Sequence, residues 1–213
     1  GKLDNSARLY AEAANAVPKD MGLQLSAAQA EVAAGSVEDA DPFLKRAQAL
    51  DPNYYRLHAI LGEIAQLQER GPEAVHEYKA ALANLPKSPV EGSLYGIQLH
   101  MDLVALYQNL EEDSAAHNEL QIAQTEINAL DGSGPARGQF LRLRALIRLN
   151  AGNLDGALAD VKDPLALDEH DPNNLQLNGD ILMMLVRTDD AIAVQKRVLE
   201  IDPANRFALT SLG

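Results

Sequence analysis

The chain has 213 residues, of which 46% are apolar and 4% aromatic, and its 18 basic and 31 acidic side chains give a formal net charge of −13. This balance argues against a nucleic-acid-binding protein, because such a protein needs a basic stripe, and we interpret the acidity as a contribution to solubility. The chain has no cysteine, which excludes disulfides, thiolate zinc sites and cysteine nucleophiles, and no apolar run approaches the roughly 18 residues of a membrane span.

The first and last segments both have the pattern of part of a helical hairpin. Residues 3–17 carry apolar side chains at helical spacing and are followed by Pro18, which cannot continue a helix. Residues 206–213 have the pattern of a helix that stops at a small residue, Gly213. We therefore interpret residues 1–20 and 206–213 as partial repeats, and the sequence as a piece of a longer array.

Between these ends a unit of fixed length recurs. Pro18, Pro52 and Pro86 follow one another at intervals of 34 residues. A fixed period in this range is typical of stacked helix–turn–helix repeats, in which proline ends one helix and a polar residue caps the next. The repeats that we predict are 21–54, 55–88, 97–130, 138–171 and 172–205.

Small side chains recur at fixed positions of this unit, where two helices must approach closely. Tyr78 occupies a large position of the same unit. The small residues in this phase are Gly62, Ala74, Ala81, Ala145, Ala157, Gly179 and Ala191.

The middle of the chain departs from the period at two insertions, 89–96 and 131–137. We expect the first to lengthen the following helix by about two turns, or ~12 Å. Both insertions should lie at the same edge of the array, where they could serve a partner or be neutral loop growth. A further irregularity is Pro164, which should break or kink the helix expected from Asp155 to Leu167 near Lys162–Asp163.

The repeated residues resemble the tetratricopeptide repeat (TPR) family. The resemblance covers nearly the whole chain and is carried by Leu61, Gly62, Ala74, Tyr78, Ala81, Pro86, Ala145, Gly152, Ala157, Gly179, Ala191 and Pro203. It implies an all-α fold, a right-handed superhelical α-solenoid of antiparallel helix pairs with about five full repeats and a concave groove lined by first helices. It also implies a structural salt bridge between Arg144 and Asp160.

The family's groove phase, carried onto this chain, predicts a peptide-binding surface that is rich in amides and holds two methionines. Co-chaperone members clamp a carboxylate with Lys and Asn. Leu25 with Gln29, and Ala59 with Glu63, occupy those positions here, so we do not expect that clamp. The predicted groove residues are Gln29, Arg56, Glu63, Gln66, Gln98, Met101, Asn109, Gln139, Arg142, Asn173, Gln176, Asp180 and Met183.

The sequence contains no pattern typical of catalysis, metal binding or a cofactor. The five histidines share no metal-ligand spacing, and no phosphate loop or nucleophile elbow is present. We expect His58 to be half-buried and the other histidines to lie on the surface. We therefore predict no enzyme, no catalytic residue, no metal and no cofactor.

Three functions remain open at this point. The first is a scaffold that binds a protein or peptide partner. In a simpler version of this hypothesis the groove binds nothing and the array serves only as a spacer or scaffold. The second is a non-catalytic helical region of a larger enzyme or of a bacterial cell-envelope assembly or secretion protein. The third is self-association through the terminal repeat faces. The bacterial cytoplasm and periplasm are both compatible with the composition.

Overall fold

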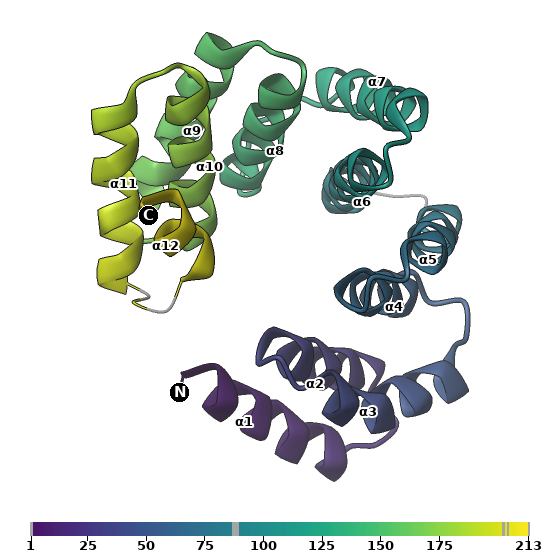
Figure 1. Ribbon diagram of the computed structural model, residues 1–213. Helices are drawn as coiled ribbons and strands as arrows, with labels where there is room; N and C mark the ends of the chain where they lie inside the picture. Colours follow the sequence, from purple (N-terminus) through teal and green to yellow (C-terminus); the bar gives the residue numbers. More distant parts are fainter. Residues whose placement is uncertain (1, 87–89, 202, 204, 213) are drawn as a thin grey trace. The chain divides into compact units, whose positions relative to one another are not determined.

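The computed structural model describes residues 2–86, 90–201, 203 and 205–212, and the regular elements within them are all α-helices. The helices follow one another with short connections (Figure 1). They are α1 (Lys2–Ala16), α2 (Met21–Ala33), α3 (Val37–Leu50), α4 (Tyr55–Leu67), α5 (Gly71–Ala83), α6 (Val90–Asn109), α7 (Asp113–Ala129), α8 (Arg137–Asn150), α9 (Leu154–Leu167), α10 (Pro172–Met184), α11 (Thr188–Ile201) and α12 (Arg206–Leu212).

The chain divides into two compact units. Unit 1 comprises Gly1–Lys87 and Ala105–Asp113, and unit 2 comprises Ser88–Val104 and Ser114–Gly213. Within unit 1, α2 packs on α3 and α4 packs on α5, and within unit 2, α8 packs on α9 and α10 on α11. Each pair buries the apolar faces of both helices, so the core is a series of small clusters rather than one centre.

The turn inside each hairpin has the same geometry. The second residue after the first helix takes a positive φ in five places, at Gly35, Glu69, Glu111, Gly152 and Val186. The next backbone N–H then bonds back to the carbonyl five residues earlier, as from Arg187 N to Leu182 O (2.9 Å). This closing turn satisfies carbonyls that the helix end would leave free. In the α4–α5 hairpin the turn residue is Glu69, whereas Gly71 already belongs to α5.

Replacing Val186 by glycine is expected to stabilise unit 2. Val186 has a φ of 59° and is 83% exposed, so its β-branched side chain bears the strain of a left-handed conformation without packing in return. Glycine relieves this strain, but it also has more conformational freedom in the unfolded chain. The net increase in the free energy of unfolding should be about 0.5–1 kcal/mol. Urea unfolding measures the gain. Val186→Ala should give much less, and an equal gain from alanine would contradict the backbone explanation.

The long helix α6 agrees with the expected extension. It has 20 residues, compared with 13 in α4, and it continues through Gly96 without interruption. The expected cap at Ser88 and Pro89 lies outside the described residues. The segment 131–137 connects α7 to α8, and in it Gly132 approaches the Phe140 ring so closely that a Cβ would come within 2.4 Å of it.

The predicted break at Pro164 is wrong. Helix α9 runs from Leu154 to Leu167 with Pro164 inside it, and the Pro164 carbonyl accepts the closing bond from Asp168 N (3.0 Å). The proline stands in the last turn of the helix, where it removes a single hydrogen bond, and its ring is buried. Burial of that ring offsets part of the cost of the lost bond, and the helix continues through Pro164 without an interruption.

Candidate functional site

In unit 1 the predicted groove residues hydrogen-bond to other side chains. Gln29 on α2 donates from Nε2 to Glu63 Oε2 on α4 at 2.7 Å, across two consecutive hairpins. Gln66 accepts a bond of 3.0 Å from the Tyr78 hydroxyl of its own hairpin. Gln29, Arg56, Glu63 and Gln66 are all partly exposed. Hydrogen bonds therefore fix some of the polar side chains on these first helices, and the side chains remain accessible to solvent.

Unit 2 repeats this arrangement with other partners. Gln98 on α6 donates to Asp102 Oδ1 (2.9 Å), and its Oε1 accepts a long bond of 3.4 Å from Arg142 Nη2 on α8. On α10, Gln176 Nε2 donates to Asp180 Oδ1 at 2.8 Å. Partial burial of the Asp180 carboxyl raises its pKa, and the bond from Gln176 opposes that shift. Amide and charged groups of neighbouring first helices thus contact one another in this unit too.

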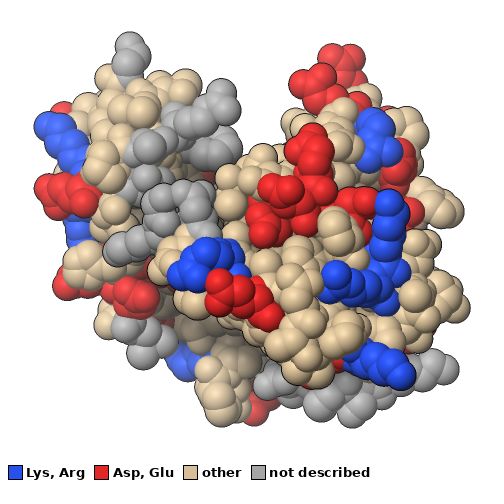
Figure 2. Space-filling view, turned by 90° about the horizontal axis from the view of Figure 1, so that it is seen from below, with Lys and Arg blue, Asp and Glu red and all other residues tan. Residues whose placement is uncertain are grey.

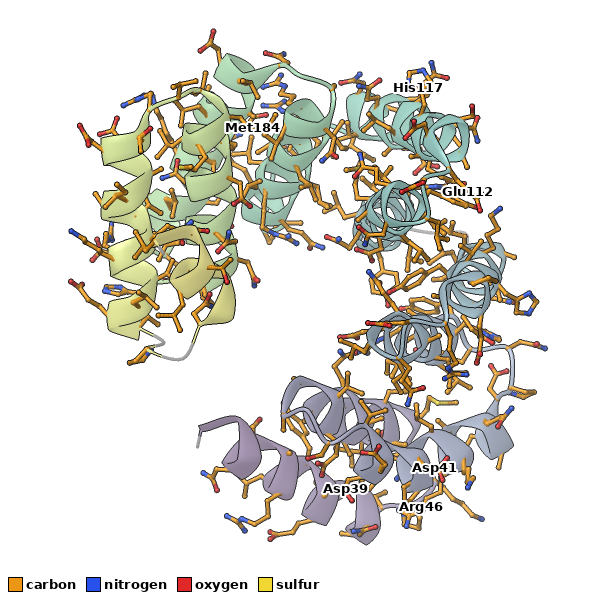
Figure 3. The ribbon with its side chains drawn as sticks, viewed as in Figure 1. Asp39, Asp41, Arg46, Glu112, His117 and Met184 are labelled. Atoms are coloured by element: carbon orange, nitrogen blue, oxygen red, sulfur yellow. The ribbon has the colours of Figure 1, made fainter. Side chains whose placement is uncertain are left out.

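Met101 does not lie on this surface. It is only 4% exposed and belongs to the core cluster with Leu94, Ile97 and Val104. Gln98, Asp102 and Ala105 on α6 keep some exposure. Met101 instead packs with Leu94, which belongs to the extended first part of this helix. The remaining predicted positions Asn109, Gln139, Asn173 and Met183 are exposed. Met184, at the end of α10, is exposed as well (Figure 3), and the sequence phase did not single it out.

In each of three hairpins, a carboxylate on the second helix contacts a histidine or arginine side chain on the first helix. His58 Nδ1 lies 2.7 Å from Glu77 Oε2, and His100 Nδ1 lies 2.6 Å from Glu119 Oε2. His58 is half-buried as expected, but the prediction of a surface position for His100 is wrong, because its side chain is 12% exposed. In both pairs the histidine and the glutamate are 19 residues apart. This shared spacing is visible in the sequence and could have indicated the contacts.

The third pair is the Arg144–Asp160 salt bridge, which is present with one more partner than expected. Arg144 donates from Nε (2.8 Å) and Nη2 (2.7 Å) to the two Asp160 oxygens, and Arg148 Nη1 donates to Oδ2 at 2.7 Å. Asp160 is 6% exposed. The hydrogen bonds to Asp160 raise the pKa of Arg144 against the effect of burial, so the guanidinium stays charged. These groups hold α8 to α9 and are structural.

The small residues lie at close helix contacts. Ala74, Ala81, Ala145, Ala157 and Ala191 are fully buried. A Cβ added to Gly62 would come within 2.8 Å of the Tyr78 ring, and one added to Gly179 within 2.7 Å of Gln195 Nε2. Side chains larger than hydrogen therefore cannot be accommodated at Gly62 without movement of the ring.

The described part of the chain contains no cluster of three or more acidic or histidine side chains able to hold a metal ion. Within the same residues no helix has the length and apolarity needed to cross a membrane. On the face drawn in Figure 2, acidic and basic side chains are interspersed, and the described residues form no broad basic surface there.

Comparisons with known proteins give a fold. No family model matches the chain, and no curated protein sequence matches it. Among solved structures, TTC0263, a thermophilic TPR protein of Thermus thermophilus, aligns over 91% of this chain and 99% of its own, with a TM-score of 0.67 and 20% identity. The type IV pilus biogenesis factor PilW aligns over 99% and 91%, with a TM-score of 0.55 and 16% identity.

The APC/C hetero-tetramer Cut9–Hcn1 aligns over 99% of this chain at a TM-score of 0.64 and 15% identity, and this chain spans 39% of the matched chain. The described helices also pack as consecutive pairs, as they do in a helical repeat protein. This chain has the TPR fold. In TPR terms, α2, α4, α6, α8 and α10 are first helices, and α3, α5, α7, α9 and α11 are second helices.

Proposed function

We propose that this TPR chain is a non-catalytic scaffold that binds an extended segment of a partner protein along the polar side chains of its first helices. The observation that carries the proposal is the contact between first helices of consecutive hairpins. Gln29 bonds to Glu63 in unit 1, and Arg142 bonds to Gln98 in unit 2. Within each unit, polar side chains of two consecutive first helices therefore meet across a hairpin boundary.

Such a surface suits a peptide main chain. An extended peptide presents N–H and C=O groups at regular intervals, and glutamine and asparagine side chains can donate to the one and accept from the other. The bonds that these side chains make now are partly exposed, so exchanging them for bonds to a peptide changes the free energy little. Met183, which is 46% exposed, adds an adaptable apolar contact.

The TPR neighbours support this proposal at the level of architecture. PilW is a type IV pilus biogenesis factor, and at 16% identity its likeness to this chain is one of fold. The proposed binding surface therefore rests on residues of this chain and not on the binding residues of a similar protein. It lies on the first helices of the repeats that we propose at 138–171 and 172–205.

The test uses a displayed library of extended peptides, selected on the full chain and measured by calorimetry. The variant Arg142→Glu with Gln176→Ala should weaken the selected peptides about tenfold or more, because it removes one charged and one amide contact, each of about 1 kcal/mol. Met183→Ala should weaken binding by a smaller factor.

A matched control is Lys45→Glu with Gln48→Ala. Both residues are exposed on the second helix α3, and the change in charge is the same. This control should leave the affinity within about twofold. Selected peptides that lose nothing on the first-helix variant, or that lose as much on the control, would refute the first-helix surface as the binding site.

A further inference from the structure

A groove in unit 2 lies away from the first-helix surface. It runs between the second helices α9 and α11, with α10 as its floor, and has a volume of about 580 Å³. Apolar side chains line its inner part, namely Leu158, Leu182 and Val194. Lys162, Arg187 and Arg197 stand among the lining residues as the basic groups. Its size falls in the range of sites that hold a ligand or an inserted side chain.

The groove exists because the α10–α11 hairpin lacks the long side chains that fill the equivalent space in the α8–α9 hairpin. In the α8–α9 hairpin, Arg144 and Arg148 extend from the first helix to Asp160, and the cavity they line is about 210 Å³. One repeat later the equivalent positions hold Asn178, Leu182 and Val194. Two long charged side chains and their carboxylate are thus replaced by shorter residues, two of them apolar. The replacement leaves both the space and an apolar floor.

The charges around the groove favour an anion. Among its lining residues, Arg187 donates to Asp190 (Nε–Oδ2, 2.8 Å) and Arg197 approaches Glu169 (Nη2–Oε2, 3.4 Å). These two pairs are exposed and worth little, so their arginines can exchange partners. Within the described part of the chain, Lys162 has no ion-pair or hydrogen-bond partner. Three basic and two acidic side chains therefore leave the lining with one excess positive charge, in a chain whose net charge is −13.

We propose that this groove is a second binding site, which takes an acidic peptide segment of a partner and inserts one of its apolar side chains between α9 and α11. The apolar side chain covers Leu158, Leu182 and Val194, and flanking carboxylates pair with Lys162 and the two arginines. The groove is partly open to solvent. A small molecule usually needs an enclosed pocket, so the groove suits a peptide segment better. The site uses none of the first-helix residues of the proposed function.

The test uses a fluorescein-labelled synthetic peptide with leucines flanked by glutamates, its analogue with every glutamate replaced by lysine, and laurate as a single-chain anion. At low salt the acidic peptide should bind the full chain at least about tenfold more tightly than the lysine analogue, because its charges complement the rim. Lys162→Glu should weaken it about fivefold or more. Ala193→Glu, at an exposed position in the lining, should abolish it by steric and charge repulsion.

Lys196→Glu is the matched control. It reverses one exposed charge on the same helix α11 but lies outside the groove lining, and it should change the affinity less than about twofold. Circular dichroism confirms that each variant is folded. Equal binding of both peptides, equal effects of Lys162→Glu and Lys196→Glu, or binding of laurate without the peptide would each overturn the proposal. Loss of first-helix binding would leave it intact, since the two sites share no residue.

Discussion

Replacing Asp160 by alanine is expected to destabilise unit 2 by about 2–4 kcal/mol, because a buried ion pair that loses one partner leaves uncompensated charge behind. Asp160 accepts bonds from both Arg144 and Arg148 and is 6% exposed. The two guanidiniums would keep their charge, since an arginine in a protein does not deprotonate. Their side chains are 29% and 32% exposed, so water can replace part of the lost contact, and the loss stays below that of a fully buried pair.

Urea unfolding followed by circular dichroism measures this loss, and amide hydrogen exchange localises it to α8 and α9. The control is Asp163→Asn on the same helix. Asp163 pairs with Arg137 at 2.9 Å, but both side chains are more than half exposed, so this change should cost no more than about 1 kcal/mol. If Asp160→Ala were as mild as the control, Asp160 would contribute no more than a surface pair.

Replacing Gln195 by methionine is expected to stabilise unit 2 by about 1–3 kcal/mol, the cost of burying an amide whose hydrogen bonds are unmade. Gln195 is 2% exposed, and within the described residues neither its Nε2 nor its Oε1 has a hydrogen-bond partner. Equivalent positions of other repeats hold the apolar residues Leu44 and Leu120. Methionine has nearly the same length and flexibility as glutamine, so it can fill the space against Gly179 without the polar atoms.

The gain is measured by the shift of the urea midpoint. Gln48→Met is the matched control, because Gln48 is exposed on α3 and its replacement should change stability by less than about 0.5 kcal/mol. A loss of stability in Gln195→Met would show that the amide is engaged by a group that repays its burial. A gain equal to that of the control would show that the burial carries no cost.

The repeat period predicted the helices because it depends on local and nearest-neighbour rules. Prolines and turn residues end helices wherever they occur, and a small residue at a fixed phase permits close packing in any hairpin. The resemblance to TPR proteins implied the pairing of Arg144 with Asp160, and the structure contains it within one hairpin. The His58–Glu77 and His100–Glu119 pairs share a spacing of 19 residues. This spacing joins a histidine to a carboxylate, so a comparison of the histidines with one another does not reveal it.

Other features depended on how much surface each helix covers. Met101 has a phase suited to the surface, yet the longer helix α6 and its neighbours bury it. Pro164 breaks a helix by its covalent structure, but its place in the last turn and the burial of its ring let α9 continue.

The amino-acid sequence by itself determined the repeat, the order of the helices and the resemblance to TPR proteins, because these follow from periodic contacts between residues close in the chain. The tertiary structure decided which polar groups are buried with partners, as at Asp160, and which are buried without them, as at Gln195. It also decided that the space filled by Arg144 and Arg148 in one hairpin is an open groove at the next. Such differences depend on the combined volumes of side chains from three helices. A local sequence pattern does not predict that combined volume.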